Sequence, residues 1–199
     1  MDVFLSPATV LIAAYLVGSI PFGLIVTRLG GEGDIRQIGS GNIGATNVLR
    51  TGNKLLAALT LIGDAGKGAA IVLVVSALGG SPLLIAIAGA ASVVGHCFPV
   101  WLKFRGGKGI ATNVAVFAAF DIRLGLAFAI LWLGTAAVTR YSSLAALVAT
   151  LGCSVTAFSL TMDMPIAVAV LMMSALSWAR HHQNIGRLLT GTESRIGGK

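Results

Sequence analysis

The chain has 199 residues, and only 11% of them are charged, against roughly 25% in a typical soluble domain. Hydrophobic residues make up 56% of the chain, its mean hydropathy is +0.90, and 14 Lys and Arg residues outnumber 7 Asp and Glu residues. This composition excludes a water-soluble surface and predicts a basic integral membrane protein. The 26 glycines follow no G-X-Y period, which excludes a collagen helix and favours close packing between helices.

Uncharged runs along the chain have lengths suited to membrane-spanning helices, which need about 20 residues to cross a hydrocarbon core of about 30 Å. The run 68–102 is too long for one helix and contains the turn signal Gly79-Gly80-Ser81-Pro82, so we expect two spans there. The run 109–120 is short, and its length alone leaves a short span and a re-entrant segment open. The predicted spans of this all-α protein are 3–27, 55–79, 82–102, 109–120, 124–139, 141–162 and 164–179.

The distribution of basic residues decides between a span and a re-entrant segment at 109–120. Lys and Arg gather at 28–54, 103–108 and 180–199, with Arg140 between the last two groups. The positive-inside rule places all of these in the cytoplasm, which requires an even number of crossings between successive groups. With the first span, this predicts seven transmembrane helices, with the N-terminus outside and the C-terminus cytoplasmic.

Residues 1–199 are expected to form a single transmembrane domain, because no repeat, low-complexity tract or soluble segment interrupts the pattern. The N-terminus does not resemble a cleavable signal peptide, since Asp2 and no Lys or Arg precede the first apolar run. Cys97 and Cys153 lie in apolar runs without metal-ligand spacing. They indicate neither a disulfide framework nor a zinc site, and no metal or cofactor is expected.

The segment 39–50 is a glycine-rich loop that formally contains G-x-G-x-x-G. We reject the dinucleotide fingerprint, because no strand precedes the loop and no soluble βαβ unit fits. Glycines still let backbone N–H groups converge on an anion, and Arg50 offers a two-pronged donor for phosphate. Neutral hydrogen-bonding side chains lie among the glycines: Ser40, Asn42, Thr46 and Asn47. An anion site is favoured, and an ordinary flexible loop is the alternative.

A second glycine-rich segment, Gly106-Gly107-Lys108-Gly109, precedes the short run. Free N–H groups, the helix dipole and the Lys108 ammonium are expected to meet one anion there. The segment is not a Walker A loop, since G-x-x-x-x-G-K-[ST] is absent. Lys103 and Arg105 are better explained by positive-inside charge, whereas Lys108, flanked by glycines, is expected to be functional.

The third segment, 180–191, is basic and polar. If the last span continues as a helix, Arg180, Asn184 and Arg187 share one face and His181 lies beside Asn184. An interfacial basic helix that holds lipid headgroups is the alternative.

Asp64 and Lys67 are three residues apart inside the second span. A charge at that depth costs about 2.5–3.5 kcal/mol on insertion scales, so the two are expected to face the helix bundle and pair. A structural ion pair is favoured over a catalytic one, and His96 is expected to pack or hydrogen-bond. Several catalytic signatures are absent from the sequence: an H-x4-D dyad, a G-x-S-x-G elbow and an H-E-x-x-H motif.

Together these segments resemble the bacterial acyl-phosphate-dependent glycerol-3-phosphate acyltransferase family. The matching strings are GSGNIGATNVLR at 39–50, GHCFPVWLKFRGGKGIAT at 95–112 and RHHQNIGRLLTG at 180–191. The resemblance implies transfer of a fatty acyl group from acyl phosphate to the sn-1 hydroxyl of glycerol 3-phosphate. Lysophosphatidate and phosphate would be released in this first acylation of phospholipid synthesis. It also implies a bacterial cytoplasmic (inner) membrane protein with its active site on the cytoplasmic side.

The resemblance further implies a set of site residues. The expected catalytic residues are Ser40, Arg50, Lys108, His181 and Asn184. The expected substrate-binding residues are Asn42, Thr46, Gly106, Gly107, Ser143 and Arg187. A phosphate oxygen of glycerol 3-phosphate is expected to take the proton of the attacking hydroxyl, so no side-chain base is needed. His182 stands where the family commonly has Arg, which leaves the duty of that Arg open.

The implied partners are the two small-molecule substrates and membrane lipid, with no nucleic acid, and the chain is expected to be a monomer. The acyl tail is expected to lie in a groove among the apolar helices. A transporter or channel for a phosphorylated anion is the alternative, favoured by the charges inside the second span. Against it, the polar residues crowd one face and leave no polar route across the membrane. A non-catalytic scaffold that binds anionic lipid is a third interpretation.

Overall fold

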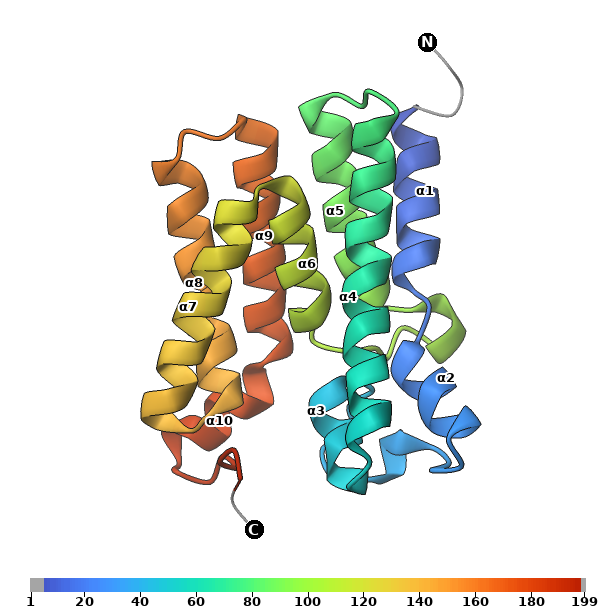
Figure 1. Ribbon diagram of the computed structural model, residues 1–199, viewed down its shortest axis with the longest axis vertical. Coiled ribbons are helices and arrows are strands. Elements are labelled where there is room, and N and C mark those ends of the chain that lie inside the picture. Colours follow the sequence, from blue (N-terminus) through green and yellow to red (C-terminus); the bar gives the residue numbers. More distant parts are fainter. Residues whose placement is uncertain (1–5, 198–199) are drawn as a thin grey trace.

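The computed structural model describes residues 6–197, and within them it contains helices and connecting turns but no strand (Figure 1). The α-helices are α1 (Pro7–Gly18), α2 (Phe22–Leu29), α3 (Ala45–Val48), α4 (Lys54–Ala77), α5 (Pro82–Cys97), α6 (Ile110–Phe120), α7 (Ile122–Thr139), α8 (Ser142–Ser159), α9 (Met164–Arg180) and α10 (His182–Leu189). Short 3-10 turns are η2 (Ile35–Gln37), η3 (Leu49–Thr51) and η4 (Val100–Leu102). The predicted helical class is confirmed.

The helix boundaries follow from local sequence signals. Ser81 caps α5 by accepting a hydrogen bond from the Leu84 N–H, and Pro82 occupies the first turn, where its missing N–H costs nothing. Gly79 adopts a φ of 76°, which closes the turn between α4 and α5. The predicted division of the long apolar run is therefore confirmed.

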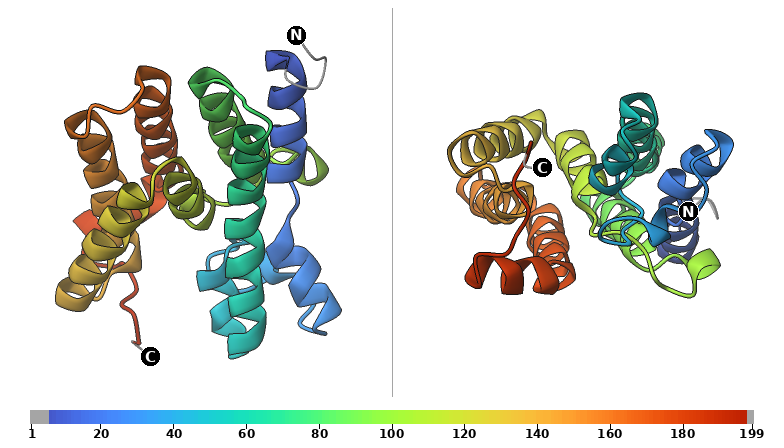
Figure 2. Two further views of the ribbon diagram at one scale, coloured as in Figure 1. Left: turned by 45° about the horizontal axis from the view of Figure 1, so that its top comes forward. Right: turned by 90° about the horizontal axis from the view of Figure 1, so that it is seen from below.

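The long helices run in alternating directions through the molecule (Figure 1). Seen along the bundle, α7 to α10 form one group and α1, α2, α4 and α5 form another, with α6 between them (Figure 2). Glycines permit the closest approaches, as expected. A Cβ at Gly18 of α1 would lie 2.1 Å from the Ser92 carbonyl oxygen of α5, and one at Gly95 would lie 2.2 Å from the Tyr15 carbonyl oxygen.

Five segments are long and apolar enough to cross a bilayer: Pro7–Leu29, Lys54–Ala77, Pro82–Leu102, Ile122–Thr139 and Ser142–Ser159. A sixth is reached if α9 and α10, which meet at a bend of 61°, are counted together. Helix α6 has 11 residues and is therefore about 16 Å long, short of the hydrocarbon thickness. The predicted number of seven spans therefore depends on α6 and stays a prediction.

The first predicted span, 3–27, differs from the structure in its continuity. Its first residues lie outside the described part of the chain, and the helix is interrupted between Gly18 and Phe22 before α2 continues to Leu29. Pro21 explains the break, because a proline has no N–H to donate and its ring disfavours a helical residue before it. Tyr15 braces this region through a 2.8 Å hydrogen bond from its hydroxyl to the Phe98 carbonyl.

Candidate active site

Side chains from separate helices converge on the carboxylate of Glu193, which follows α10. The Ser143 hydroxyl and the Asn184 amide nitrogen donate to its Oε1 at 2.7 and 2.6 Å, respectively. Arg187 Nε donates to its Oε2 at 2.6 Å. The Glu193 side chain is only 7% exposed. Three residues expected in the substrate site are therefore brought together, and the sequence interpretation missed the carboxylate that joins them.

Lys108 joins this cluster from the loop that precedes α6, since its ammonium donates a hydrogen bond to the Asn184 amide oxygen. Burial and the nearby Arg187 charge lower the pKa of Lys108 to about 8, and Glu193 partly opposes them. Burial raises the pKa of Glu193, but hydrogen bonds from Ser143, Asn184 and Arg187 outweigh it and leave that pKa below its ordinary value. The carboxylate is therefore ionised at neutral pH, and most of Lys108 is charged.

The loop at 39–50 is organised by Asn47, which is buried. Its Oδ1 accepts hydrogen bonds from the Ser40 N–H and hydroxyl and from Arg50 Nη1, at 3.0 to 3.2 Å. Its amide nitrogen donates to the carbonyl of Asn42 in the loop and to those of Ile35 and Ile38 just before it. Asn47 was noted as a polar loop residue but not as part of the site. The sequence shows only that Asn47 lies in a glycine-rich loop, and that position does not predict that its side chain is buried.

Arg50 links this loop to the C-terminal segment, because its Nη2 donates to the Ser194 hydroxyl at 3.3 Å. Ser194 follows Glu193 directly, so Arg50 borders the same cluster as Lys108. Asn42 Oδ1 accepts from the Gly44 N–H at 3.0 Å and shapes the turn. Thr46 is exposed, and its hydroxyl makes no hydrogen bond to the described residues.

The N–H groups of the glycine pair before Lys108 are not free, contrary to the expectation from the sequence. The Gly106 N–H donates to the Cys97 carbonyl, and the Gly107 N–H donates to the His96 carbonyl, both at 3.1 Å. A Cβ at Gly107 would lie 2.0 Å from His96 Nε2. The prediction that these two N–H groups are free for an anion was wrong, because the loop needs them to close against the end of α5. The N–H groups of Lys108 and Gly109 have no acceptor within residues 6–197.

The third segment does not continue as one straight helix. His181, at φ −95° and ψ 10°, ends α9, and its ring Nδ1 lies 2.7 Å from the Ser177 carbonyl oxygen. The condition for Arg180, Asn184 and Arg187 to share one face is therefore not met, since α10 starts at an angle of 61° to α9. Asn184 and Arg187, both in α10, still meet at Glu193. His181 is buried, which lowers its pKa to about 4 and keeps the ring neutral at pH 7.

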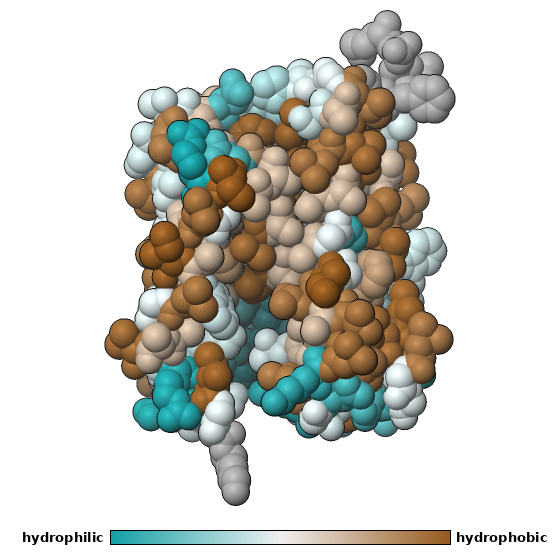
Figure 3. All heavy atoms as spheres, viewed as in Figure 1, coloured by the Kyte–Doolittle hydropathy of each residue, from teal (hydrophilic) through white to brown (hydrophobic). Residues whose placement is uncertain are grey.

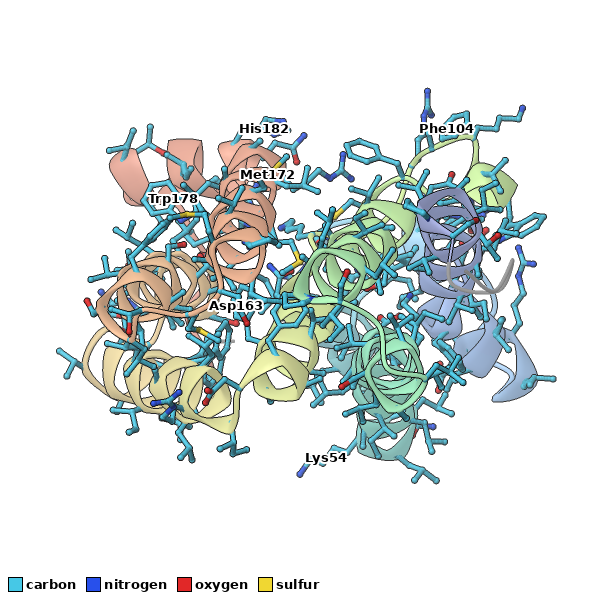
Figure 4. The ribbon with its side chains drawn as sticks, turned by 90° about the horizontal axis from the view of Figure 1, so that it is seen from above. Lys54, Phe104, Asp163, Met172, Trp178 and His182 are labelled. Atoms are coloured by element: carbon cyan, nitrogen blue, oxygen red, sulfur yellow. The ribbon has the colours of Figure 1, made fainter. Side chains whose placement is uncertain are left out.

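His182 lies at the outer edge of the molecule in Figure 4 and is exposed. Its ring Nδ1 lies 3.0 Å from the carbonyl oxygen of Ala179, in the last turn of α9, and makes no contact with Glu193 among the described residues. The position at which the family commonly has Arg therefore lies apart from the Glu193 cluster in this chain.

The predicted ion pair inside the second span is confirmed. Lys67 donates to Asp64 Oδ1 at 2.8 Å, and both side chains are almost completely buried. Lys67 also donates to the Ile20 carbonyl at 2.7 Å, and Ile20 lies in the break between α1 and α2. His96 Nδ1 lies 3.5 Å from the same Asp64 oxygen. The pair thus ties the first span, α4 and the end of α5 together.

The expected site residues gather at one end of a largely apolar surface, and a smaller charged group that includes Asp121 and Arg123 lies at the opposite end. Hydrophobic side chains cover most of the face in Figure 3, and a hollow near its lower end is lined by more hydrophilic ones. A cleft of about 440 Å³ at this end is lined by Asp34, Arg36, Gln37, Gly41, Arg105 and Gly106. Another cleft, of about 380 Å³, lies among the turns at the opposite end and contains none of the expected site residues.

Known proteins match this chain over nearly its whole length. The model of a family described as "Glycerol-3-phosphate acyltransferase" matches residues 8–191. A relative of that name from Agrobacterium fabrum is 54% identical over 98% of this chain and 95% of its own length. Another from Caulobacter vibrioides is 52% identical over 98% of this chain and 90% of its own length.

Two solved structures of PlsY (YgiH), an integral membrane glycerol 3-phosphate acyltransferase, have the same fold. The glycerol 3-phosphate form is 38% identical, has a TM-score of 0.91 and covers 96% of each chain. The lysophosphatidic acid form is also 38% identical, with a TM-score of 0.89 over 95% of this chain and 94% of the other. With its apolar helices, this chain is an integral membrane protein. It belongs to the glycerol-3-phosphate acyltransferase family.

Proposed function

We propose that this protein transfers a fatty acyl group from acyl phosphate to the sn-1 hydroxyl of glycerol 3-phosphate and releases lysophosphatidate and phosphate. The observation that carries the proposal is the convergence of Lys108, Asn184 and Arg187 beside Arg50 at one polar end. Three cationic side chains around neutral donors suit a reaction in which both substrates carry phosphate. Family membership and the two PlsY forms support the acceptor and the product.

The donors around Glu193 leave capacity for a substrate phosphate. Arg187 contacts Glu193 through Nε, and its terminal nitrogens make no hydrogen bond within residues 6–197. The Lys108 ammonium has three N–H donors, of which Asn184 uses one. Glu193 therefore orients these side chains without using all of their donors. We assign Ser40, Arg50, Lys108, Ser143, His181, Asn184 and Arg187 to the glycerol 3-phosphate side of the site.

The acyl-phosphate head is assigned to a second set of residues: Asn42, Thr46, Gly106, Gly107 and Lys108, the last of which belongs to both sets. The N–H groups of Gly106 and Gly107 already donate to backbone carbonyls, so these two glycines contribute only their lack of a side chain, which lets the phosphate approach the backbone closely. The unengaged N–H groups of Lys108 and Gly109 supply donors to the anion. We place the acyl tail beyond these residues, in a groove among the apolar helices.

The chemistry needs no side-chain base. The sn-1 oxygen attacks the acyl carbon, the bond from that carbon to the phosphate oxygen breaks, and inorganic phosphate leaves. The proton of the hydroxyl passes to a phosphate oxygen of glycerol 3-phosphate. The Lys108 ammonium neutralises the charge that grows on the departing phosphate, and His181, neutral at pH 7, holds the acceptor by hydrogen bonding.

We further propose seven crossings, with α6 as a short one, the polar end in the cytoplasm of a bacterial inner membrane and residues 1–199 as a single monomeric domain. Contacts between distant basic segments support a common side, since Arg140 bonds the Ile196 carbonyl at 2.8 Å and Arg50 bonds Ser194. A cysteine placed at Gly197 should resist an impermeant reagent in whole cells and react after permeabilisation. Labelling of this cysteine in intact cells would overturn the orientation.

A transporter for a phosphorylated anion is the remaining alternative, favoured by the buried Asp64 and Lys67. Sealed proteoliposomes separate the two functions. With acyl phosphate and glycerol 3-phosphate on the polar side, an acyltransferase forms lysophosphatidate and releases phosphate, whereas a transporter accumulates glycerol 3-phosphate in the lumen. Uptake without acylation would contradict the proposed enzyme.

A further inference from the structure

We propose that Arg180 is a positioning residue for Lys108: it clamps the Gly106–Gly107 loop so that the ammonium stays at the acyl phosphate. The inference rests on the proposed function for its assignment of Lys108 to the reaction. It assigns Arg180 a role other than the one its spacing in the sequence suggested, which was to share a face with Asn184 and Arg187.

The guanidinium of Arg180 holds both carbonyl groups of the glycine pair. Its Nε donates to the Gly107 oxygen at 3.1 Å, and its Nη2 donates to the Gly106 oxygen at 2.9 Å. The guanidinium carbon also lies 5.2 Å from the centre of the Phe98 ring, a cation–π contact that fixes its plane. A planar guanidinium meets two carbonyls and a ring at once, which the single point charge of lysine does not.

The other edge of the loop is held by the end of α5. The N–H groups of Gly106 and Gly107 donate to the carbonyls of Cys97 and His96, and the His96 ring lies directly against Gly107. His96 is in turn 3.5 Å from the buried Asp64 carboxylate. The glycine pair is thus fastened by its donors on one edge and, through Arg180, by its acceptors on the other.

Lys108 follows this fastened pair directly and is itself fixed at its backbone. The Ser177 hydroxyl donates to the Lys108 carbonyl at 3.1 Å, and the Asn113 amide donates to Ser177 at 2.7 Å. The backbone of Lys108 is thus held in place, and its side chain extends to the Glu193 cluster, where it contacts Asn184. A displacement of about 1 Å in a reacting geometry costs as much as 10²-fold in rate. Arg180 therefore controls catalysis by anchoring the loop, without itself touching substrate.

The test is a double-mutant cycle on purified protein with acyl phosphate and glycerol 3-phosphate. Arg180→Lys should lower kcat by about 10- to 100-fold, which is the scale of a lost positioning contact. The KM for glycerol 3-phosphate should change less than threefold. In the Lys108→Ala background, the same Arg180→Lys change should have no further effect, because the group being positioned is gone. Arg105→Lys is the matched control, since the exposed Arg105 side chain makes no hydrogen bond to the described residues.

If Arg180→Lys does not purify as folded protein, Arg180→Gln supplies the same test. Its amide nitrogen keeps a donor for the Gly106 or Gly107 carbonyl but loses the second contact and the planar guanidinium. Equal losses in the wild-type and Lys108→Ala backgrounds, or an unchanged kcat, would overturn the role of Arg180. Absence of turnover in the wild type would instead overturn the proposed function, so the two failures are distinguishable.

Discussion

Lys108 donates a hydrogen bond to the amide of Asn184, although the two residues are 76 positions apart in the chain. The same amide donates through its nitrogen to Glu193, so its oxygen faces the cation and its nitrogen faces the carboxylate. Asn184 therefore connects the second and third polar segments of the sequence. This connection brings Lys108, which follows the Gly106–Gly107 pair, into the cluster that we assign to substrate phosphate.

Removing the Lys108 ammonium should abolish most turnover without unfolding the protein. Lys108→Ala loses the charge proposed to neutralise the departing phosphate, and the loss of such a contact costs roughly 3–4 kcal/mol, about 10²–10³ in rate. Steady-state assays of phosphate release measure the effect. Lys103→Ala, which removes an exposed ammonium from the same loop, serves as the control and should remain active. Near-normal activity of Lys108→Ala would mean that this loop only packs.

The activity should fall as the pH rises through about 8. Burial and the Arg187 charge lower the pKa of Lys108 to about 8, so the charged form required for catalysis dominates below that pH and disappears above it. The pH profile of kcat/KM reports this group in the free enzyme. A Lys108→Arg variant with measurable activity should lack the decline, because a guanidinium stays charged. The same alkaline decline in that variant would assign it to another group.

Much of the fold was predictable from local sequence signals, whereas the contacts that hold the candidate site together were not. The turn at Gly79–Pro82 and the Asp64–Lys67 pair follow from capping, turn chemistry and the cost of charge in a bilayer. The bend at His181 was missed, because helical spacing does not reveal that a ring will bond the Ser177 carbonyl. Glu193 was missed as well, since its importance comes from contacts with separate helices and not from its neighbours in the sequence.

Arg50→Lys should not behave as a conservative change. Arg50 uses Nη1 on Asn47 and Nη2 on Ser194, a two-pronged arrangement that one ammonium does not reproduce. If this guanidinium also grips the acceptor phosphate, the KM for glycerol 3-phosphate should rise and kcat should fall, because that phosphate is the proposed proton acceptor. The KM for acyl phosphate should change much less. An unchanged acceptor KM and kcat would move Arg50 to a lipid-headgroup role.

Glu193→Gln should destabilise the protein and lower kcat/KM for glycerol 3-phosphate. The amide oxygen still accepts from Ser143 and Asn184, but Arg187 loses its ionic partner, at a cost of about 1–3 kcal/mol for a largely buried hydrogen-bonded charge. Thermal unfolding in detergent measures the stability. Asp163→Asn is the control, since Asp163 is an exposed carboxylate in the turn between α8 and α9, which lies at the opposite end of the molecule (Figure 1). A variant as stable as the wild type and better at binding glycerol 3-phosphate would show that Glu193 competes with substrate.

The donor-resolved product assay tests the central claim most directly. Purified protein in lipid is given glycerol 3-phosphate with acyl phosphate, acyl-CoA or acyl carrier protein, and lysophosphatidate and inorganic phosphate are quantified together. We predict the sn-1 lysophosphatidate and phosphate in equal amounts from acyl phosphate, and no product from either thioester. Equal rates from a thioester donor, or phosphate release without lysophosphatidate, would contradict the proposed reaction.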